Sequence, residues 1–207
     1  MILGIDFDNT IIDYDALFYK KALERGLIKN NILANKKVIR DSVRLLPQGE
    51  IQWQKLQIYA YGEGIAQAKL IKGVKEVFDA CHKAEIKLNI ISHKTEFPNL
   101  TKEKVNLRQA ALDWMKKNNF FSKNGLGLSM GQVFFESTRE DKIKRIVKLK
   151  CTHFIDDLEE TFLEDSFPGD VEQILYQPYA GKINLDKVKA FHSWDQIYEY
   201  FFAATRK

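Results

Sequence analysis

The chain has 207 residues, a length typical of one domain or of one domain that carries an insertion. Hydrophobic residues make up 45% of it, with only 11 glycines and 4 prolines, which excludes a disordered, collagenous or low-complexity protein. The 32 Lys and Arg residues against 28 Asp and Glu residues leave a net charge of +4, with both signs interspersed. So mild a charge, with no basic run and no nucleic-acid motif, predicts no nucleic-acid partner.

The sequence also carries no sign of a membrane or secreted protein. No stretch approaches the roughly 20 apolar residues that span a bilayer, so we expect no membrane partner. The apolar N-terminal run has no basic residues before it and meets Asp6 and Asp8 at once, unlike a signal peptide. Cys81 and Cys151 have neither CxxC spacing nor a His at ligand spacing, so both are expected to be buried thiols. These features predict a cytoplasmic protein.

Short apolar runs typical of buried strands alternate with helical patterns along the chain. The runs are at residues 2–5, 88–91, 153–155 and 173–176. Apolar residues at helical spacing predict helices at 73–84, around 107–115, around 143–147 and at 195–202. The third of these follows Ser137-Thr138-Arg139-Glu140, which predicts a capping box. This alternation favours an α/β fold with a doubly wound parallel sheet and helices on both faces.

The stretch after the first strand is longer than a crossover connection needs. Residues 13–70 contain helical patterns at about 14–25, 37–46 and 52–61, and no convincing strand. A structureless loop of this length would be unusual in a compact domain. We therefore expect a small α-helical insertion at 13–70, with residues 1–12 and 71–207 forming the α/β core.

Polar side chains follow three of the predicted strands. Asp6 and Asp8 follow the first, Ser92 ends the second, and Asp156-Asp157 ends the third. The carboxyl ends of the strands are where doubly wound sheets bind ligands. Four carboxylates there would repel one another unless a cation or shared protons compensated them. Since no His or Cys is among them, the oxygen ligands suit Mg²⁺.

A lysine in the helix before the third strand can join this group. Lys142 precedes Asp156 by 14 residues, which leaves room for one helix and the following strand. The side-chain amine of Lys142 can therefore reach the carboxyl ends of the strands. Lys144, on the same helix, is the alternative.

The sequence DFDNT at residues 6–10 resembles the DxDxT signature of the haloacid dehalogenase (HAD) superfamily of phosphatases and phosphotransferases. The other motifs of that family follow in the same order: Ser92, Lys142 and the pair Asp156-Asp157. The resemblance covers nearly the whole chain and implies a HAD-like Rossmannoid core. Residues 13–70 lie between the first and second motifs, where many family members carry a mobile helical cap.

The resemblance implies a two-step reaction. Asp6 would attack phosphorus and form an aspartyl-phosphate, which splits one difficult hydrolysis into two steps. Asp8 would protonate the leaving alkoxide and then deprotonate the attacking water. Mg²⁺ would be held by Asp6, Asp157 and the backbone carbonyl of Asp8.

Other matching residues would bind phosphate or support the site. Ser92 and Lys142 would hold the phosphoryl oxygens, and Asn9 lies close enough in sequence to touch the substrate. Thr10 would fix the loop, and Asp156 would support Asp157. Many family members with a Gly-Asp version of the last motif carry a second acid four residues later. This chain has Asp156-Asp157 followed at that spacing by Thr161, so it resembles the Asp-Asp subclass.

The predicted function is therefore a Mg²⁺-dependent phosphatase of a small-molecule phosphate monoester. A 5′-nucleotidase-like activity on nucleoside monophosphates and a catalytically idle HAD-like binding or regulatory protein are alternatives. A receiver domain also clusters Asp residues around Mg²⁺, but on different strands and without a large insertion. A dehalogenase fits less well, because Asp8, Lys142 and the acidic pair suit phosphate and a metal.

Overall fold

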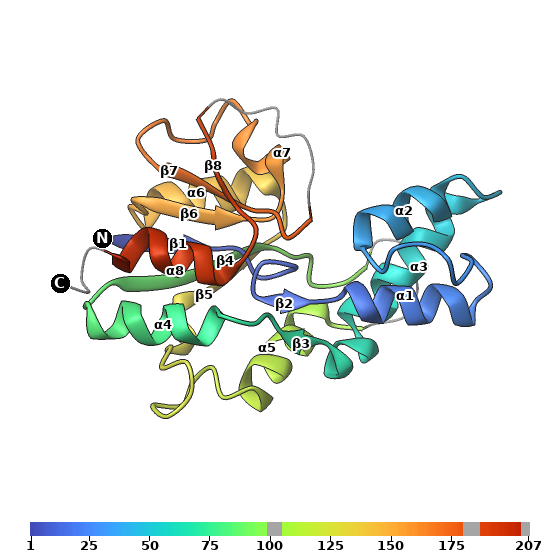
Figure 1. The fold of residues 1–207 in the computed structure, drawn as a ribbon, viewed down its shortest axis with the longest axis horizontal. Coiled ribbons are helices and arrows are strands. Elements are labelled where there is room, and N and C mark those ends of the chain that lie inside the picture. Colours follow the sequence, from blue (N-terminus) through green and yellow to red (C-terminus); the bar gives the residue numbers. More distant parts are fainter. Residues whose placement is uncertain (99–104, 180–186, 204–207) are drawn as a thin grey trace. The chain divides into compact units, whose positions relative to one another are not determined.

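Six parallel strands form the central sheet of the structure, a computed structural model that describes residues 1–98, 105–179 and 187–203. Their order across the sheet is β5-β4-β1-β6-β7-β8 (Figure 1). The strands are β1 (Ile2–Ile5), β4 (Lys87–His93), β5 (Val133–Glu136), β6 (His153–Asp156), β7 (Glu172–Tyr176) and β8 (Lys189–Phe191). From β1 the chain first adds β4 and β5 on one side of the sheet and then β6, β7 and β8 on the other. The strand order therefore reverses at β1, as in a doubly wound sheet. The predicted fold class is confirmed.

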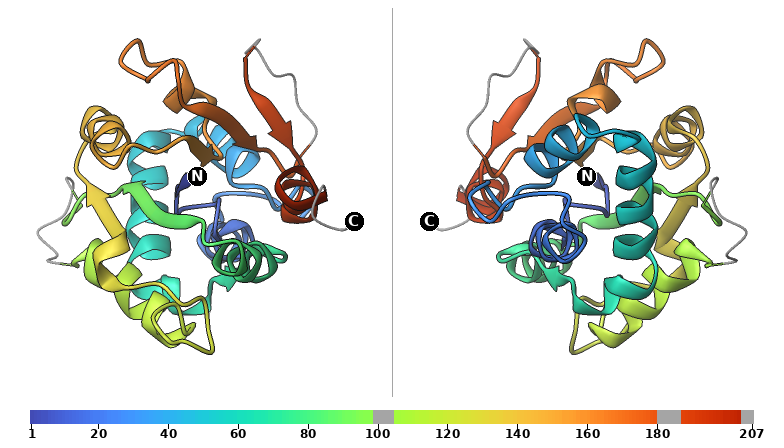
Figure 2. Two further views of the ribbon diagram at one scale, coloured as in Figure 1. Left: turned by 90° about the vertical axis from the view of Figure 1, so that its left-hand side faces the viewer. Right: turned by 90° about the vertical axis from the view of Figure 1, so that its right-hand side faces the viewer.

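Helices cover both faces of this sheet. Figure 2 shows α4 (Val74–Lys83) and α8 (Trp194–Phe202) together on one face, and α6 (Arg139–Lys148) on the other. The short helix α7 (Glu159–Phe162) follows β6, and a 3-10 turn at Met130–Gln132 precedes β5. None of the helices among the described residues is long and apolar enough to cross a membrane.

The chain divides into two compact units, which we call the core unit and the helical unit. The core unit comprises Met1–Ile12, Leu70–Lys94 and Asn118–Lys207, and the helical unit comprises Asp13–Lys69 and Thr95–Lys117. The helical unit thus includes the segment 95–117 in addition to the expected insertion at 13–70, whereas that segment was expected in the core. A separate two-stranded sheet pairs β2 (Ile12–Asp13) with β3 (Lys69–Leu70).

The helical unit contains the three helices expected in the insertion. They are α1 (Asp15–Glu24), α2 (Lys36–Arg44) and α3 (Gly49–Tyr61), followed by a 3-10 turn at Glu63–Gln67. Phe18 stacks on Trp53 with ring centroids 4.9 Å apart, and Tyr14 and Tyr61 pack edge-on beside them. The fourth helix, α5 (Leu107–Lys117), joins this unit because the Trp114 indole donates a 3.1 Å hydrogen bond to the carbonyl of Ala68. Because Trp114 and Ala68 are 46 residues apart in the sequence, no local pattern predicts this contact.

Helix α6 begins one residue later than the sequence predicted. Its N-cap is Thr138, whose Oγ1 accepts a 3.0 Å hydrogen bond from the Asp141 N–H and donates to Asp141 Oδ2 at 2.8 Å. The predicted box from Ser137 to Glu140 is therefore wrong by one position. The pairs Ser137/Glu140 and Thr138/Asp141 both satisfy the Ser/Thr-x-x-acid pattern. The sequence pattern alone therefore does not show at which of the two positions the helix begins.

An apolar cluster fills the space between the sheet and α6. Its members come from β4, β6, β7, α6, α7 and the connections between them: Ile91, Ile143, Ile146, Cys151, Phe154, Phe162, Phe167, Val171 and Leu175. Gly4 of β1 lies opposite Phe154 in the sheet register. A Cβ at Gly4 would come within 2.6 Å of Phe154 Cδ2 and 3.1 Å of Cys151 Sγ. The phenylalanine ring therefore requires glycine at position 4.

This packing predicts the effect of adding one methyl group. Gly4→Ala should lower the free energy of unfolding by roughly 1–3 kcal/mol, because the cluster must shift to admit it. Gly169→Ala is the matched control, because a Cβ there meets no atom within 4 Å. Urea denaturation at pH 7.5 measures both, and equal midpoints for the two variants would contradict the prediction.

Both cysteines are buried and unpaired, as expected. Burial raises the pKa of Cys81 to about 12 and that of Cys151 to about 11. Since only the thiolate reacts, neither thiol should be alkylated by iodoacetamide in the folded protein at pH 8, and both should react in urea. Mass spectrometry counts the adducts. Rapid labelling of the folded protein would contradict the prediction, because it would show that the thiols are accessible to solvent.

Candidate active site

The positions of Asp6 and Asp156 follow from the packing beneath them. Side chains on a strand alternate between the faces, so residues two apart share a face. Phe154 and Gly4 meet on the face that α6 covers, and Asp156 and Asp6 each come two residues later. The Asp6 N–H donates to the carbonyl of Ile155 at 2.8 Å, which extends the β1–β6 pairing to that residue. Both carboxylates therefore lie at the carboxyl end of the sheet, on the α6 side.

Lys142 of α6 reaches these two carboxylates. Its Nζ donates hydrogen bonds of 2.7 Å to Asp6 Oδ1 and of 2.7 Å to Asp156 Oδ2. The exposed fractions of the three side chains are 3% for Lys142, 7% for Asp6 and 0% for Asp156. Lys144, the alternative in the sequence analysis, is exposed and pairs with Glu140 of its own helix at 2.6 Å. The structure therefore brings Lys142, and not Lys144, to the strand ends.

Burial and neighbouring charges shift the proton affinities of this group. Burial raises the pKa of Asp6 to about 6; Lys142 opposes the rise, whereas Asp156 and Asp8 add to it. Burial alone would lower the pKa of Lys142, but Asp156 and Asp6 hold that pKa above its usual range. The lysine is thus a permanent cation between two carboxylates.

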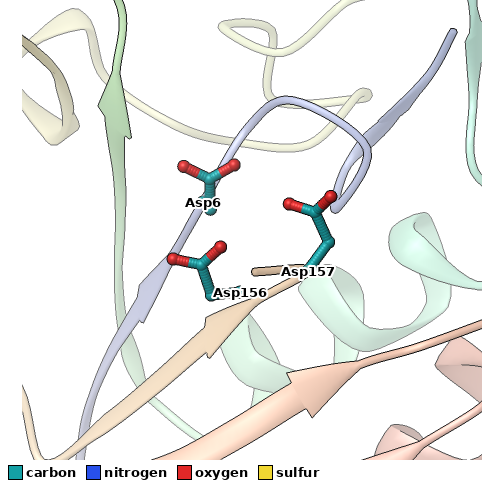
Figure 3. Close-up of side chains that lie close together, drawn as sticks. All are labelled: Asp6, Asp156 and Asp157. Carbon is teal, nitrogen blue, oxygen red and sulfur yellow. The ribbon is translucent and has the colours of Figure 1, made fainter. Parts of the chain in front are cut away.

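Asp157 adds a third carboxylate to the cluster, as Figure 3 shows. One side-chain oxygen from each of Asp6, Asp156 and Asp157 lies within 4.8 Å of the others. Asp156 is held on both sides, because its Oδ1 accepts from the Leu158 N–H at 3.0 Å while Oδ2 accepts from Lys142. A donor set of carboxylate oxygens fits a hard divalent cation such as Mg²⁺.

The loop after β1 is fixed by its own backbone. The N–H groups of Ile11 and Ile12 both donate to the carbonyl of Phe7, at 3.0 and 3.2 Å. Asn9 adopts a left-handed conformation with φ of 58°, which asparagine tolerates better than most residues. Thr10 is buried, and its Oγ1 lies 3.5 Å from Asp157 Oδ1. Thr10 thus connects the loop to the acidic pair.

Oγ of Ser92, at the end of β4, and Oδ1 of Asn9 are buried without a hydrogen-bond partner among the described residues. Buried polar atoms are nearly always hydrogen-bonded in native proteins. An unpartnered buried polar atom suits a residue that binds a polar ligand, the role that the resemblance implied for Ser92 and that the position of Asn9 beside the motif suggested for Asn9.

Asp8 lies apart from the cluster of three carboxylates and has a partner that the sequence did not predict. Asp8 Oδ2 is 2.8 Å from Nζ of Lys94, whose side chain is only 2% exposed. Lys94 follows the predicted strand-end Ser92 by two residues, which was the only local signal for it. His93, between them, points elsewhere, because its Nε2 lies 3.1 Å from the carbonyl of Ser137.

The sequence matches no protein-family model and no curated protein, but several solved structures share its fold. A HAD hydrolase of family IA, variant 3, from Entamoeba histolytica is 12% identical with a TM-score of 0.58, covering 94% of each chain. A HAD family hydrolase from Deinococcus radiodurans, with bound phosphate and sodium, is 12% identical with a TM-score of 0.56, covering 99% of this chain and 96% of the other.

A HAD-hydrolase from Bacillus subtilis bound to magnesium is 12% identical with a TM-score of 0.55, covering 96% of this chain and 97% of the other. A dehalogenase is also among the similar structures, at 12% identity and a TM-score of 0.55. The chain therefore has the HAD-like fold that the DxDxT resemblance implied. Identities this low establish the fold, and the chemistry has to be argued from the site.

The buried lysine generates a prediction about stability. Lys142→Met removes the cation and leaves Asp6 and Asp156 facing each other, so the free energy of unfolding should fall by about 3–5 kcal/mol. Lys144→Met, on the exposed side of the same helix, should leave the urea midpoint unchanged. If the two variants unfolded at the same urea concentration, Lys142 could not be compensating a buried pair of charges.

Proposed function

We propose that the protein is a Mg²⁺-dependent phosphatase that hydrolyses a small-molecule phosphate monoester through an aspartyl-phosphate. The observation that carries this proposal is the Asp6 carboxylate, buried at the end of the central strand and held by Lys142 beside two further carboxylates. The fold shared with HAD hydrolases supports it, and two of those structures contain bound phosphate or magnesium.

In the first step, Asp6 acts as the nucleophile. A carboxylate oxygen of Asp6 forms a bond to phosphorus while the bond from phosphorus to the ester oxygen breaks. Lys142 holds the carboxylate in place through Oδ1. Asp8 gives a proton to the departing ester oxygen, which leaves as an alcohol.

In the second step, water cleaves the aspartyl-phosphate. Asp8, now ionised, takes a proton from the water as its oxygen attacks phosphorus, and the bond between phosphorus and Asp6 breaks. Ser92 Oγ and the Asn9 amide are the polar groups that would hold phosphoryl oxygens as charge develops. Inorganic phosphate leaves, and Asp8 is again protonated.

Asp6 and Asp157 would hold the metal ion, with Asp156 supporting them through its bonds to Lys142 and Leu158. When bound, Mg²⁺ would reduce the repulsion between the carboxylates and the anionic phosphate and act as a Lewis acid. We place the reaction in the cytoplasm, where buried unpaired thiols such as Cys81 and Cys151 persist.

The proposal predicts the effect of one isosteric substitution. Asp6→Asn should fold normally and lose at least about 10³-fold in Mg²⁺-dependent phosphate release, because the amide cannot attack phosphorus. Asp79→Asn, an exposed acid on α4, is the matched control. Phosphate release is measured with Mg²⁺ or EDTA on an aryl phosphate, sugar phosphates and nucleoside monophosphates.

The same panel separates the alternatives. A preference for nucleoside monophosphates would assign the 5′-nucleotidase-like activity, and halide release from 2-haloacids would assign a dehalogenase. Turnover by Asp6→Asn equal to that of the control would rule out the covalent mechanism. A folded protein that acts on no member of the panel would favour a binding or regulatory role.

A further inference from the structure

Lys94 occupies a fixed position at the end of β4. Its backbone N–H donates a 2.8 Å hydrogen bond to the carbonyl of Glu136, which continues the β4–β5 pairing by one residue. Glu136 is itself held by Arg145 of α6, at 2.6 Å. The point from which the Lys94 side chain extends is therefore set by the sheet.

The side chain of Lys94 is buried beside apolar rings. Its Nζ lies 5.9 Å from the ring centroid of Phe7, a fully buried residue that packs edge-on against Phe135. A buried ammonium is stable only when it is paired, and Asp8 supplies a carboxylate at 2.8 Å. This pair differs from a solvated surface ion pair, whose partners are mobile and contribute little.

Each aspartate of the DxDxT motif therefore has its own buried lysine. Lys142 binds Asp6, and Lys94 binds Asp8. The Asp8 side chain is 15% exposed, against 7% for Asp6, so Asp8 is the more open of the two carboxylates. In the proposed reaction Asp8 is the residue that must reach the leaving group and the attacking water, and its orientation depends on what binds it.

We propose that Lys94 is a positioning residue that orients the Asp8 carboxylate for both proton transfers. This inference rests on the proposed phosphatase function. The Lys94 Nζ lies 2.8 Å from Asp8 Oδ2 and holds that oxygen by charge pairing. Asp8 carries the transferred proton on Oδ1; that O–H bond breaks as the leaving oxygen takes the proton. The ammonium then stabilises the ionised carboxylate until a proton from the attacking water returns to it.

A comparison of leaving groups tests this role. An alkyl phosphate needs a proton donor because its alkoxide is a poor leaving group, whereas p-nitrophenolate leaves without one. Lys94→Met should therefore lower kcat/KM on the alkyl phosphate by about 10²-fold, and on p-nitrophenyl phosphate by a factor at least tenfold smaller. Lys87→Met, an exposed lysine at the other end of β4, removes the same charge and should change neither.

The double variant shows whether Lys94 acts through Asp8. In an Asp8→Asn background, Lys94→Met should lower the alkyl phosphate activity by less than about twofold, because the group that it positions is already lost. Equal losses on both substrates, or additive effects in the double variant, would overturn the proposal. If Lys94→Met does not fold, Lys94→Gln gives the same comparison.

The outcomes distinguish this inference from the function on which it rests. A wild-type protein that releases phosphate from neither substrate would overturn the phosphatase function and the role of Lys94 together. A wild-type protein that is active, loses activity in Asp6→Asn and treats both leaving groups alike in Lys94→Met would uphold the phosphatase and overturn only the role of Lys94.

Discussion

The buried ammonium of Lys142 is the interaction on which the candidate site depends. It joins three elements, because α6 supplies the lysine, β1 leads to Asp6 and β6 ends at Asp156. Removing these charges from water is costly, and the two short hydrogen bonds and the charge pairing compensate for it. A cation fixed in this way also brings carboxylates together that would otherwise repel one another, and this concentration of oxygen ligands is what a metal site requires.

The apolar packing beneath the site sets its geometry. Phe154 lies against Gly4, and two residues later the same faces of β6 and β1 present Asp156 and Asp6. Ile143 and Ile146 of α6 pack into the same cluster that contains Phe154, which directs Lys142 toward the carboxylates. The positions of the charged groups thus result from hydrophobic burial a few ångströms away.

The site divides its charges in a way that suits two different tasks. Asp6 is the more buried carboxylate and belongs to the cluster that suits a metal, whereas Asp8 is more open and is held by Lys94. In a reaction where one carboxylate attacks and the other transfers protons, separate partners allow each to be oriented independently. The HAD-like fold supplies the strand ends, and the side chains placed there decide the chemistry.

Sequence alone determined the fold class, the three helices of the insertion and the carboxylates at the strand ends, because hydrophobic periodicity and short motifs are local signals. It missed β5 and β8, which are only partly buried, and the two-residue strands β2 and β3, and it did not group α5 with the helices of the insertion. Tertiary structure selected Lys142 over Lys144 and paired Lys94 with Asp8. Those choices depend on distances between segments as far as 136 residues apart, which no local pattern encodes.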